Sequence, residues 1–441
     1  MPVFKPARPD VRIAFDLLYL LGLIALSPKI AYRILRQNRY RSGWKERFGS
    51  ISRRRPDKPC IWIHAVSVGE VNATRTLIAQ LQARLPDYEI AISATTDTGI
   101  ARAKALYGDN MSVFFFPFDF SPVMKKAVAN INPSICLLME LEIWPNLAQI
   151  AAERNIPLVV VNGRISDRSF PRYLKLRRFV RPMFSRLALA LAQTQEYAER
   201  FKALGCDHDK VIVTCSLKYD TAQVADSVEG ADSLAAQLNL GPEPLWVAGG
   251  TGPDEEKIIL NTYRTLKQDT CFAPLRLAIV PRKPERFDEV ASLIEESGFD
   301  YMRYSTLKNE NRTADGKPAV ILGDTMGDLR KFYSLATVVF VGRTLTPLGG
   351  SDMMEPAALG KCTLFGPHTF NFKQTVDALL SANGAIQVQD ADELLTAMQK
   401  CLTDPHYARQ IAAAGQNVIR QNQGATKKSV DAIVSVLAAR A

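Results

Sequence analysis

Residues 338–360 read VVFVGRTLTPLGGSDMMEPAALG. Four apolar, mostly β-branched residues precede a glycine-containing loop and a segment typical of a helix start, an order that indicates a Rossmann-like α/β protein. Gly349 and Gly350 remove side chains where backbone N–H groups can approach a phosphate. Glu355, one turn into the expected helix, is suited to accept hydrogen bonds from ribose hydroxyls. The stretch predicts a nucleotide-binding loop, but a strand, a loop and a capped helix without a ligand have the same pattern.

Apolar runs of strand length alternate with longer helical patterns on both sides of this stretch. The runs lie at 61–65, 90–94, 113–116, 135–139, 158–161 and 187–192 in the first half, and at 245–248, 277–280, 320–322, 338–341, 363–365 and 386–388 in the second. This alternation predicts βαβ units with parallel strands. Residues 221–243 interrupt it, because they are rich in Ala, Asp, Ser and Gly. We therefore expect two Rossmann-like domains facing each other across a cleft, with ligands beyond the carboxyl ends of the strands.

The net charge of +10 comes from the N-terminal segment. Residues 1–58 carry fourteen Lys and Arg against four Asp and Glu, so the rest of the chain is formally neutral. A nucleic-acid-binding protein would be expected to carry its basic residues on a folded face. The charge distribution therefore argues against nucleic acid as a partner and for a basic N-terminal appendage.

An apolar run, Ile13 to Leu26, lies within this basic segment. Fourteen helical residues reach about 21 Å, whereas the hydrocarbon core of a bilayer is about 30 Å thick. We expect a monotopic or tilted anchor, held on an anionic membrane surface by the flanking arginines. The alternative is a helix that packs against the body of the protein.

No metal or cofactor is expected from the spacing of the potential ligands. The seven cysteines form no CxxC pair, and the four histidines are scattered along the chain. These patterns do not assemble a zinc site. The signatures GxxxxGK[ST] and GxGxxG are also absent, which excludes a P-loop ATPase.

Polar residues follow two of the strand-like runs in the first half. They are Ser67, Gly69 and Glu70 after the first run, and Glu140, Glu142 and Asn146 after the fourth. A carboxylate such as Glu70, near a helix start in a cleft, is placed to take a proton from a bound hydroxyl. It would equally complement the positive end of the helix, and the spacing leaves both readings open. Glu140 and Glu142 suit the hydroxyls of a sugar.

Basic residues gather after the fifth run of the first half. They are Arg164, Arg168, Arg172, Lys175, Arg177, Arg178 and Arg181, with Asp167 as the single acid among them. Such a cluster suits the phosphates of an acceptor or an anionic membrane. A solvated helix face is the alternative.

Cations and hydroxyl groups are found at further expected strand ends. In the second half, Arg282 follows Pro281 after one run, and Thr251 belongs to a glycine loop after another. Just before the linker, Ser216 and Lys218 add a hydroxyl and a further cation. Cations in these positions suit a leaving phosphate, whose negative charge grows during the reaction.

Together these motifs resemble the 3-deoxy-D-manno-octulosonic acid (Kdo) transferases, a family of GT-B glycosyltransferases. The resemblance is carried by 62–70, 139–146, Asn162-Gly-Arg164, Ser216-Leu-Lys218, Pro281-Arg282, Gly349-Gly350, Glu355-Pro-Ala-Ala and Asn371-Phe372. It implies an α/β GT-B fold and a metal-independent, inverting transfer of Kdo from CMP-Kdo to a lipid A precursor. It also implies work at the cytoplasmic face of the inner membrane, without a cofactor.

The resemblance assigns roles to matching residues. Glu70 would be the general base, Arg282 and the 349–350 loop would bind the donor phosphate, and Glu355 the ribose. The donor-binding residues would be Ser216, Lys218, Thr251, Pro281, Arg282, Gly349, Gly350, Ser351, Asp352, Glu355 and Asn371. The acceptor-binding residues would be Ser67, Gly69, Glu140, Glu142, Asn146 and Arg164. Ser351 and Asp352 stand where the family has His-Asn, so the role of that histidine is not transferred.

The implied domains are an anchor (1–45), an acceptor domain (46–220), a linker (221–243) and a donor domain with closing helices (244–441). Two other functions stay open. A GT-B nucleotide-sugar epimerase would not need the anchor. A non-catalytic membrane scaffold would bind lipid but release no CMP.

Overall fold

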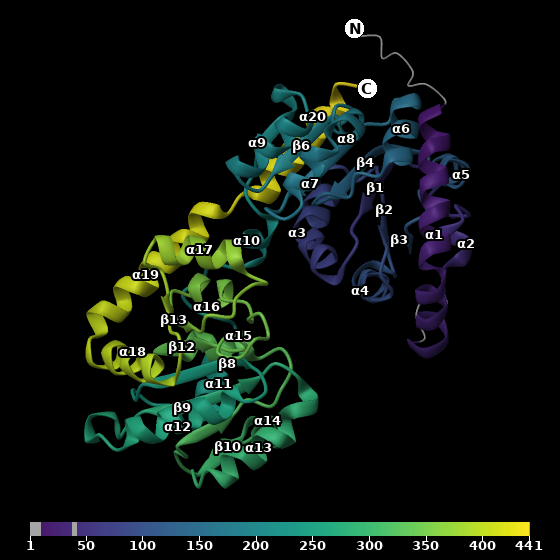
Figure 1. The fold of residues 1–441 in the computed structure, drawn as a ribbon. Helices are drawn as coiled ribbons and strands as arrows, with labels where there is room; N and C mark the ends of the chain where they lie inside the picture. Colours follow the sequence, from purple (N-terminus) through teal and green to yellow (C-terminus); the bar gives the residue numbers. More distant parts are fainter. Residues whose placement is uncertain (1–9, 38–41, 441) are drawn as a thin grey trace. The chain divides into compact units, whose positions relative to one another are not determined.

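The computed structural model describes residues 10–37 and 42–440, which form two compact units (Figure 1). The first unit holds the described residues up to Thr221 together with those from Gln423 onwards. The second unit is Ala222–Asn422. Residues 1–9 and 38–41 of the expected anchor segment lie outside the described residues.

The first unit is built on a parallel sheet in the order β3-β2-β1-β4-β5-β6-β7. Its strands are β1 Cys60–His64, β2 Glu89–Ala94, β3 Ser112–Phe115, β4 Pro133–Met139, β5 Leu158–Gly163, β6 Leu189–Ala192 and β7 Val211–Val213. Its helices include α3 Val68–Arg84, α4 Asp97–Tyr107, α5 Ser121–Ile131, α6 Pro145–Glu153, α7 Phe170–Lys175, α8 Arg177–Phe184, α9 Gln195–Leu204 and α10 Leu217–Thr221. The direction of winding reverses between β1 and β4, and such a switch point is where open parallel sheets bind ligands.

The second unit repeats this plan with the order β10-β11-β9-β8-β12-β13-β14. Its strands are β8 Leu245–Thr251, β9 Arg276–Pro281, β10 Tyr301–Arg303, β11 Val320–Leu322, β12 Val338–Val341, β13 Cys362–Phe365 and β14 Ile386–Gln387. Its helices include α11 Ala231–Gln237, α12 Glu255–Lys267, α13 Phe287–Glu296, α14 Tyr304–Glu310, α15 Leu329–Leu335, α16 Met354–Ala358, α17 Lys373–Ser381, α18 Ala391–Thr403 and α19 Pro405–Asn422. The switch point lies between β8 and β12. The prediction of two α/β units with parallel sheets is confirmed.

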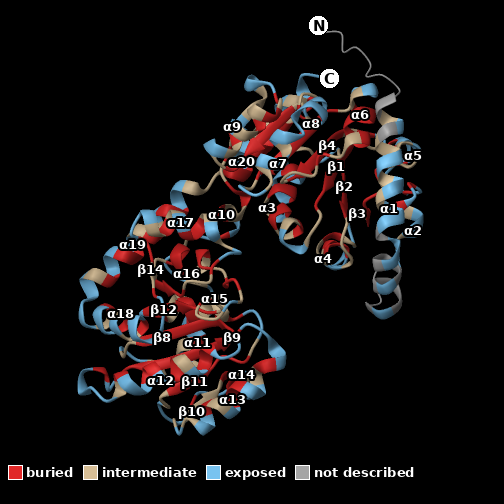
Figure 2. Cartoon of the chain, viewed as in Figure 1, coloured by how far each residue is buried: buried red, intermediate tan, exposed pale blue. Residues whose placement is uncertain are grey.

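Both sheets are buried between helices, as the red strands in Figure 2 show. This burial explains why most strands appear in the sequence as continuous apolar runs rather than as alternating patterns. β1, for example, has five buried residues in succession.

The C-terminal helix α20, Ala425–Ala438, belongs to the first unit. Val430, Ile433 and Leu437 join the core cluster that contains residues of β1 and α3. The carboxylate of Asp220 accepts hydrogen bonds from the N–H groups of Gly424 (2.7 Å) and Thr426, which caps the helix. The expected donor domain ran to residue 441, whereas in the structure residues 423–440 belong to the other unit, because the apolar face of α20 completes that core.

The N-terminal helix α1, Asp10–Gln37, contains the expected anchor run and lies beside α5 and α6 (Figure 1). Asp16 accepts hydrogen bonds from the Ser121 N–H and the Asn146 side chain (both 2.9 Å), and the Tyr19 hydroxyl donates to Asp119 (2.9 Å). Many of its apolar side chains are nevertheless exposed: Ile13, Leu17, Leu18, Leu20, Leu21, Leu23 and Ile24. Within the described residues, none of the helices combines the length and the apolar character needed to cross a bilayer. The helix is therefore fastened to the body by polar contacts while it presents apolar side chains to the outside.

Candidate functional site

The polar residues predicted after the first and fourth runs lie at the switch point of the first unit. β1 and β4 are neighbours in the sheet, so the loops that follow them leave the same edge side by side. Glu70 lies in the first turn of α3, which follows β1, whereas Glu140 and Glu142 come directly after β4. Three carboxylates from two loops therefore meet at one sheet edge.

Glu70 is held by the N-terminus of its own helix. Ser67 is the N-cap of α3, and its hydroxyl donates to Oε1 of Glu70 (2.9 Å) while accepting from the Glu70 N–H (3.4 Å). The N–H of Val66 donates to Oε2 (2.9 Å). This is a capping-box arrangement, which fixes the orientation of the carboxylate. Capping and a catalytic role are thus compatible, since each oxygen keeps a second lone pair.

Charge and burial act together on these carboxylates. Burial raises the pKa of Glu70, the hydrogen bond from Val66 lowers it, and the charge of Glu140 raises it. Burial and the charge of Glu70 raise the pKa of Glu142 to about 7, although the Trp144 indole N–H donates to Oε2 of Glu142 (3.1 Å). Glu140 itself has a positive φ of 56°, a conformation that non-glycine residues adopt rarely and mostly at functional sites.

Three other residues predicted for the acceptor side lie in different settings. Gly69 is exposed, and a Cβ there would meet only Ser67, so the space in front of the helix is open. The Arg164 side chain is exposed and forms no ion pair with a described residue. Asn146 is fully buried, and its amide donates to Asp16 and to the Asp119 carbonyl. Asn146 therefore ties α6 to α1, and we leave it out of the proposed acceptor site.

Asp119 is a buried acid that sequence reasoning missed. It accepts hydrogen bonds from the N–H groups of Asn146 (2.9 Å) and Leu147 (2.8 Å) at the start of α6. Burial raises the pKa of Asp119 to about 7, which these two hydrogen bonds oppose. Its only signal in the sequence is a single acid shortly after an apolar run, and this signal does not reveal a partner.

Ser216 and Lys218 lie at the start of α10, the last helix of the first unit before the chain enters the second unit at Ala222. The Ser216 hydroxyl is buried and accepts from the Lys218 N–H (3.4 Å). The neighbouring N–H of Leu217 donates to Oδ1 of Asn162 (3.0 Å), at the end of β5. This contact fixes the start of α10 at the sheet edge, and the roles of Ser216 and Lys218 toward a donor stay a prediction.

The switch point of the second unit is formed by the glycine-containing end of β8 and the glycine loop after β12. The end of β8 and the loop after β12 are joined by the Ser351 hydroxyl, which donates to the Gly250 carbonyl (2.7 Å). Gly349 and Gly350 have φ of 87° and 89°, which glycine adopts without strain. The N–H of Gly350 already donates to the Arg343 carbonyl (2.8 Å). Gly350 and Ser351 thus use these groups to shape the loop, and the roles of Gly349, Gly350 and Ser351 toward a donor stay a prediction.

The loop after β12 folds around a buried carboxylate, Glu255, which sequence reasoning also missed. Its oxygens accept hydrogen bonds from the backbone N–H groups of Gly252 (3.1 Å), Thr344 (2.7 Å), Leu345 (2.8 Å) and Arg343. Glu255 is completely buried. The next residue, Glu256, accepts from the Thr251 hydroxyl (2.7 Å) and pairs with Arg286 (2.7 Å). Thr251 is thereby committed to Glu256.

Charged side chains converge beside these loops. Pro281 ends β9, and Arg282 follows it with an exposed side chain. Glu355 lies in α16, which has only five residues, and Asp352 accepts from the Met354 N–H (2.9 Å) at its start. Burial raises the pKa of Glu355 to about 7, the charge of Asp352 adds to this, and Arg330 and Arg282 oppose it. The arrangement places a guanidinium and a carboxyl within electrostatic reach of each other at the sheet edge.

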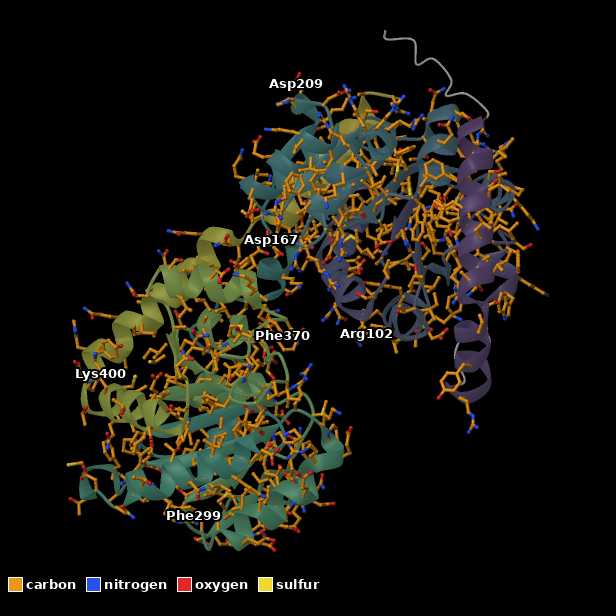
Figure 3. All side chains as sticks on the ribbon, viewed as in Figure 1. Arg102, Asp167, Asp209, Phe299, Phe370 and Lys400 are labelled. Carbon is orange, nitrogen blue, oxygen red and sulfur yellow. The ribbon has the colours of Figure 1, made fainter. Side chains whose placement is uncertain are left out.

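Aromatic and amide groups complete this edge. Asn371 is exposed, and its N–H donates to the Gly349 carbonyl (3.2 Å). Phe370, labelled in Figure 3, is also exposed on the loop after β13. A Cβ at Gly349 would collide with both side chains. Tyr333 is buried with its hydroxyl against Gly249, and that hydroxyl has no hydrogen-bond partner among the described residues.

We expect Glu255→Ala to destabilise the protein by at least about 3 kcal/mol, because four buried backbone N–H groups lose their acceptor. The loop from Arg343 onwards should also lose its shape. Urea denaturation measures the loss of stability. Glu285→Ala, an exposed glutamate of the same unit, should change stability by no more than about 0.5 kcal/mol. Equal stability of the two variants would contradict the role of Glu255.

The described residues contain no cluster of three or more His, Cys, Asp or Glu side chains able to hold a metal ion.

The two units together have the GT-B type of glycosyltransferase fold. A glycosyltransferase from Rickettsia africae matches 86% of this chain and 99% of its own, with a TM-score of 0.54 and 13% identity. The UDP-GlcNAc 2-epimerase of Neisseria meningitidis matches 85% of this chain and 100% of its own, with a TM-score of 0.54 and 11% identity. Both likenesses concern the fold alone.

Comparison of the sequence identifies the family, whereas the structural likenesses identify only the fold. Residues 42–221 match the family described as 3-deoxy-D-manno-octulosonic-acid transferase (kdotransferase). The chain is 36% identical to the 3-deoxy-D-manno-octulosonic acid transferase of Haemophilus influenzae over 89% of this chain and 91% of the relative. It is 30% identical to that of Bordetella pertussis over 94% and 98%. The chain belongs to the Kdo transferase family of glycosyltransferases.

Proposed function

We propose that the protein transfers Kdo from CMP-Kdo to a hydroxyl of a lipid A precursor, with inversion and without a metal ion. Family membership supports Kdo transfer. The observation that carries the chemical assignment is Glu70, a carboxylate with a raised pKa, oriented at a switch point and flanked by two further acids. Such a group can accept a proton at neutral pH from a hydroxyl that is about to attack.

In the proposed reaction the acceptor oxygen forms a bond to the anomeric carbon of Kdo while the bond to the CMP phosphate breaks. Glu70 takes the proton of the attacking hydroxyl, and Glu140 and Glu142 bind neighbouring sugar hydroxyls. CMP leaves as a phosphate monoester anion.

The second unit supplies the donor site in this proposal. Arg282 stabilises the negative charge that grows on the departing phosphate, together with the Gly349 N–H. Glu355 binds the ribose hydroxyls, and its raised pKa lets it either accept or donate a hydrogen bond near neutral pH. Glu255 acts through the loop that it shapes and touches no substrate.

We further propose that the protein works on the cytoplasmic face of the inner membrane. The exposed apolar residues of α1 would lie in the lipid interface. An exposed basic face on α7 and α8 would contact anionic headgroups, and it comprises Arg172, Lys175, Arg177, Arg178 and Arg181. A helix with an apolar side and nearby cations is suited to this location.

The test is incubation with CMP-Kdo and lipid A precursor, followed by mass spectrometry of the lipid and assay of CMP, with and without EDTA. We expect a lipid heavier by Kdo, with release of CMP that EDTA does not reduce. An epimerase, whose fold the protein shares, would change the sugar without modifying the lipid. A lipid-binding scaffold would bind vesicles without releasing CMP. Loss of transfer in EDTA would contradict the metal-independent part of the proposal.

We expect Glu140→Gln to shift the acid side of the pH profile of kcat/KM to lower pH. The charge of Glu140 raises the pKa of Glu70, so removing this charge lowers it, and the base stays ionised to a lower pH. Initial rates measured from about pH 5 to 8 report the shift. A shift in the opposite direction would contradict the assignment of Glu70 as the titrating base.

A further inference from the structure

An apolar cavity of about 600 Å³ lies in the first unit, beside the carboxylates of its switch point. It is bounded by α1, by the loop between β4 and α6, and by α7 and α8. Its lining includes Leu18, Trp144, Tyr173, Leu176, Phe179 and Val180, and among the described residues that line it the carboxylate is that of Glu142. The volume falls within the range of about 300–1,000 Å³ that is usual for ligand sites.

The position of Glu142 connects this cavity to the proposed acceptor site. Glu142 lines the cavity, and its charge and that of Glu70 act on each other. The Trp144 indole, which bonds to Glu142, belongs to the same wall. A ligand that reached Glu70 with a polar group and extended past Glu142 would enter an apolar space. The combined site is therefore suited to an amphiphilic ligand, with a polar end at Glu70 and an apolar part in the cavity.

The rim of the cavity carries charge of one sign. Leu176 and Phe179 are 54% and 67% exposed, so the cavity opens to the outside between them. The five cations of the basic face of α7 and α8 lie on both sides of Leu176 and Phe179 in the sequence. None of these five cations forms an ion pair with a described residue. Unpaired arginines and lysines beside an apolar opening suit a ligand that combines an anionic headgroup with a hydrocarbon chain.

We propose that this cavity binds a fatty acyl chain of the lipid acceptor, with the acceptor's anionic groups on the basic face and its reacting hydroxyl at Glu70. This inference rests on the proposed function and adds a subsite to it. A chain held here would make the enzyme select acylated acceptors, because each buried methylene contributes to binding and two of them already amount to about tenfold in affinity.

The experiment compares kcat/KM for the acylated lipid A precursor with kcat/KM for its chemically deacylated form. Val180→Trp places a large ring in the cavity, and we expect the ratio of the two values to fall about tenfold or more. Leu174→Trp adds the same ring to exposed surface of α7 outside the cavity, so it controls for a general change in membrane affinity and should keep the wild-type ratio. An unchanged ratio in a folded Val180→Trp variant overturns the proposal.

A second measurement uses the wild-type protein and does not depend on turnover. A lipid A precursor with a diazirine in one acyl chain is photolysed on the protein, and labelled peptides are mapped by mass spectrometry. We expect labels in 141–145 and 173–184. Labelling elsewhere overturns the proposal, as does equal labelling of these segments by a diazirine phosphatidylglycerol, which would identify bulk bilayer lipid as the occupant. Labels in the cavity without any transfer of Kdo would refute the proposed function while retaining the acyl site.

Discussion

Glu70→Gln is expected to lower kcat for Kdo transfer by about 10³-fold, within the range by which a general base accelerates proton transfer. Glutamine at this position still accepts hydrogen bonds from Val66 and Ser67, so the start of α3 should stay intact. CMP binding should therefore remain close to normal, because the proposed donor residues Arg282, Gly349 and Glu355 belong to the other unit. Single-turnover rates and calorimetric titration with CMP separate the two effects.

The chain provides a matched control for this variant. Glu393 occupies the equivalent position in the first turn of α18, with Asp390 as the N-cap, and it accepts the Gln389 N–H at 2.7 Å. Glu393→Gln makes the same chemical change to the same kind of helix cap, and activity should be unaffected. If Glu70→Gln retained normal turnover, or if both variants lost activity equally, Glu70 would be a capping residue only.

Arg282→Gln is expected to lower kcat/KM for CMP-Kdo by about 10²-fold or more, because one preorganised partner of a developing charge is usually worth this much. The side chain is exposed and makes no ion pair with a described residue, so its removal should leave the fold stable. The charge of Arg282 also lowers the pKa of Glu355, and its loss should therefore raise that pKa further. Initial rates of CMP release at varied donor concentration give kcat/KM for CMP-Kdo.

Lys283→Gln is the control for this second variant. Lys283 is the adjacent cation, its side chain is 62% exposed, and it lies 3.8 Å from Glu285. A general loss of positive charge near the donor site would affect both variants, whereas a specific contact with phosphate would affect Arg282→Gln alone. Similar rates for the two variants would remove Arg282 from the donor site.

The sequence predicts the two-domain plan well because buried parallel strands leave continuous apolar runs. It misses two strands for one physical reason. β7 and β10 are three residues long and only partly buried, since they lie at the edges of their sheets. The unit to which α20 belongs also cannot be predicted from a local sequence pattern. The spacing of its apolar residues reveals an apolar helix face, but it does not say which of the two cores this face covers.

The candidate sites are predictable to a similar degree. Placing polar residues at strand ends brings Glu70 and Glu140 together, because the switch-point rule depends only on strand order. The same reasoning does not reveal that the Asn146 side chain donates to Asp16 and to the Asp119 carbonyl, or that the Gly350 N–H donates to the Arg343 carbonyl within its own loop. The buried carboxylates Glu255 and Asp119 could not be predicted from the sequence. Each is stabilised by backbone N–H groups that lie far away in the chain.

The return of α20 to the first unit has a consequence for synthesis. A ribosome delivers the second unit as one uninterrupted piece, which can acquire its native packing as soon as it emerges. The first unit, in contrast, must wait with part of its apolar surface uncovered until α20, Ala425–Ala438, has been translated. We therefore expect nascent chains stalled before residue 423 to hold a protease-resistant second unit and a first unit that is still open to cleavage.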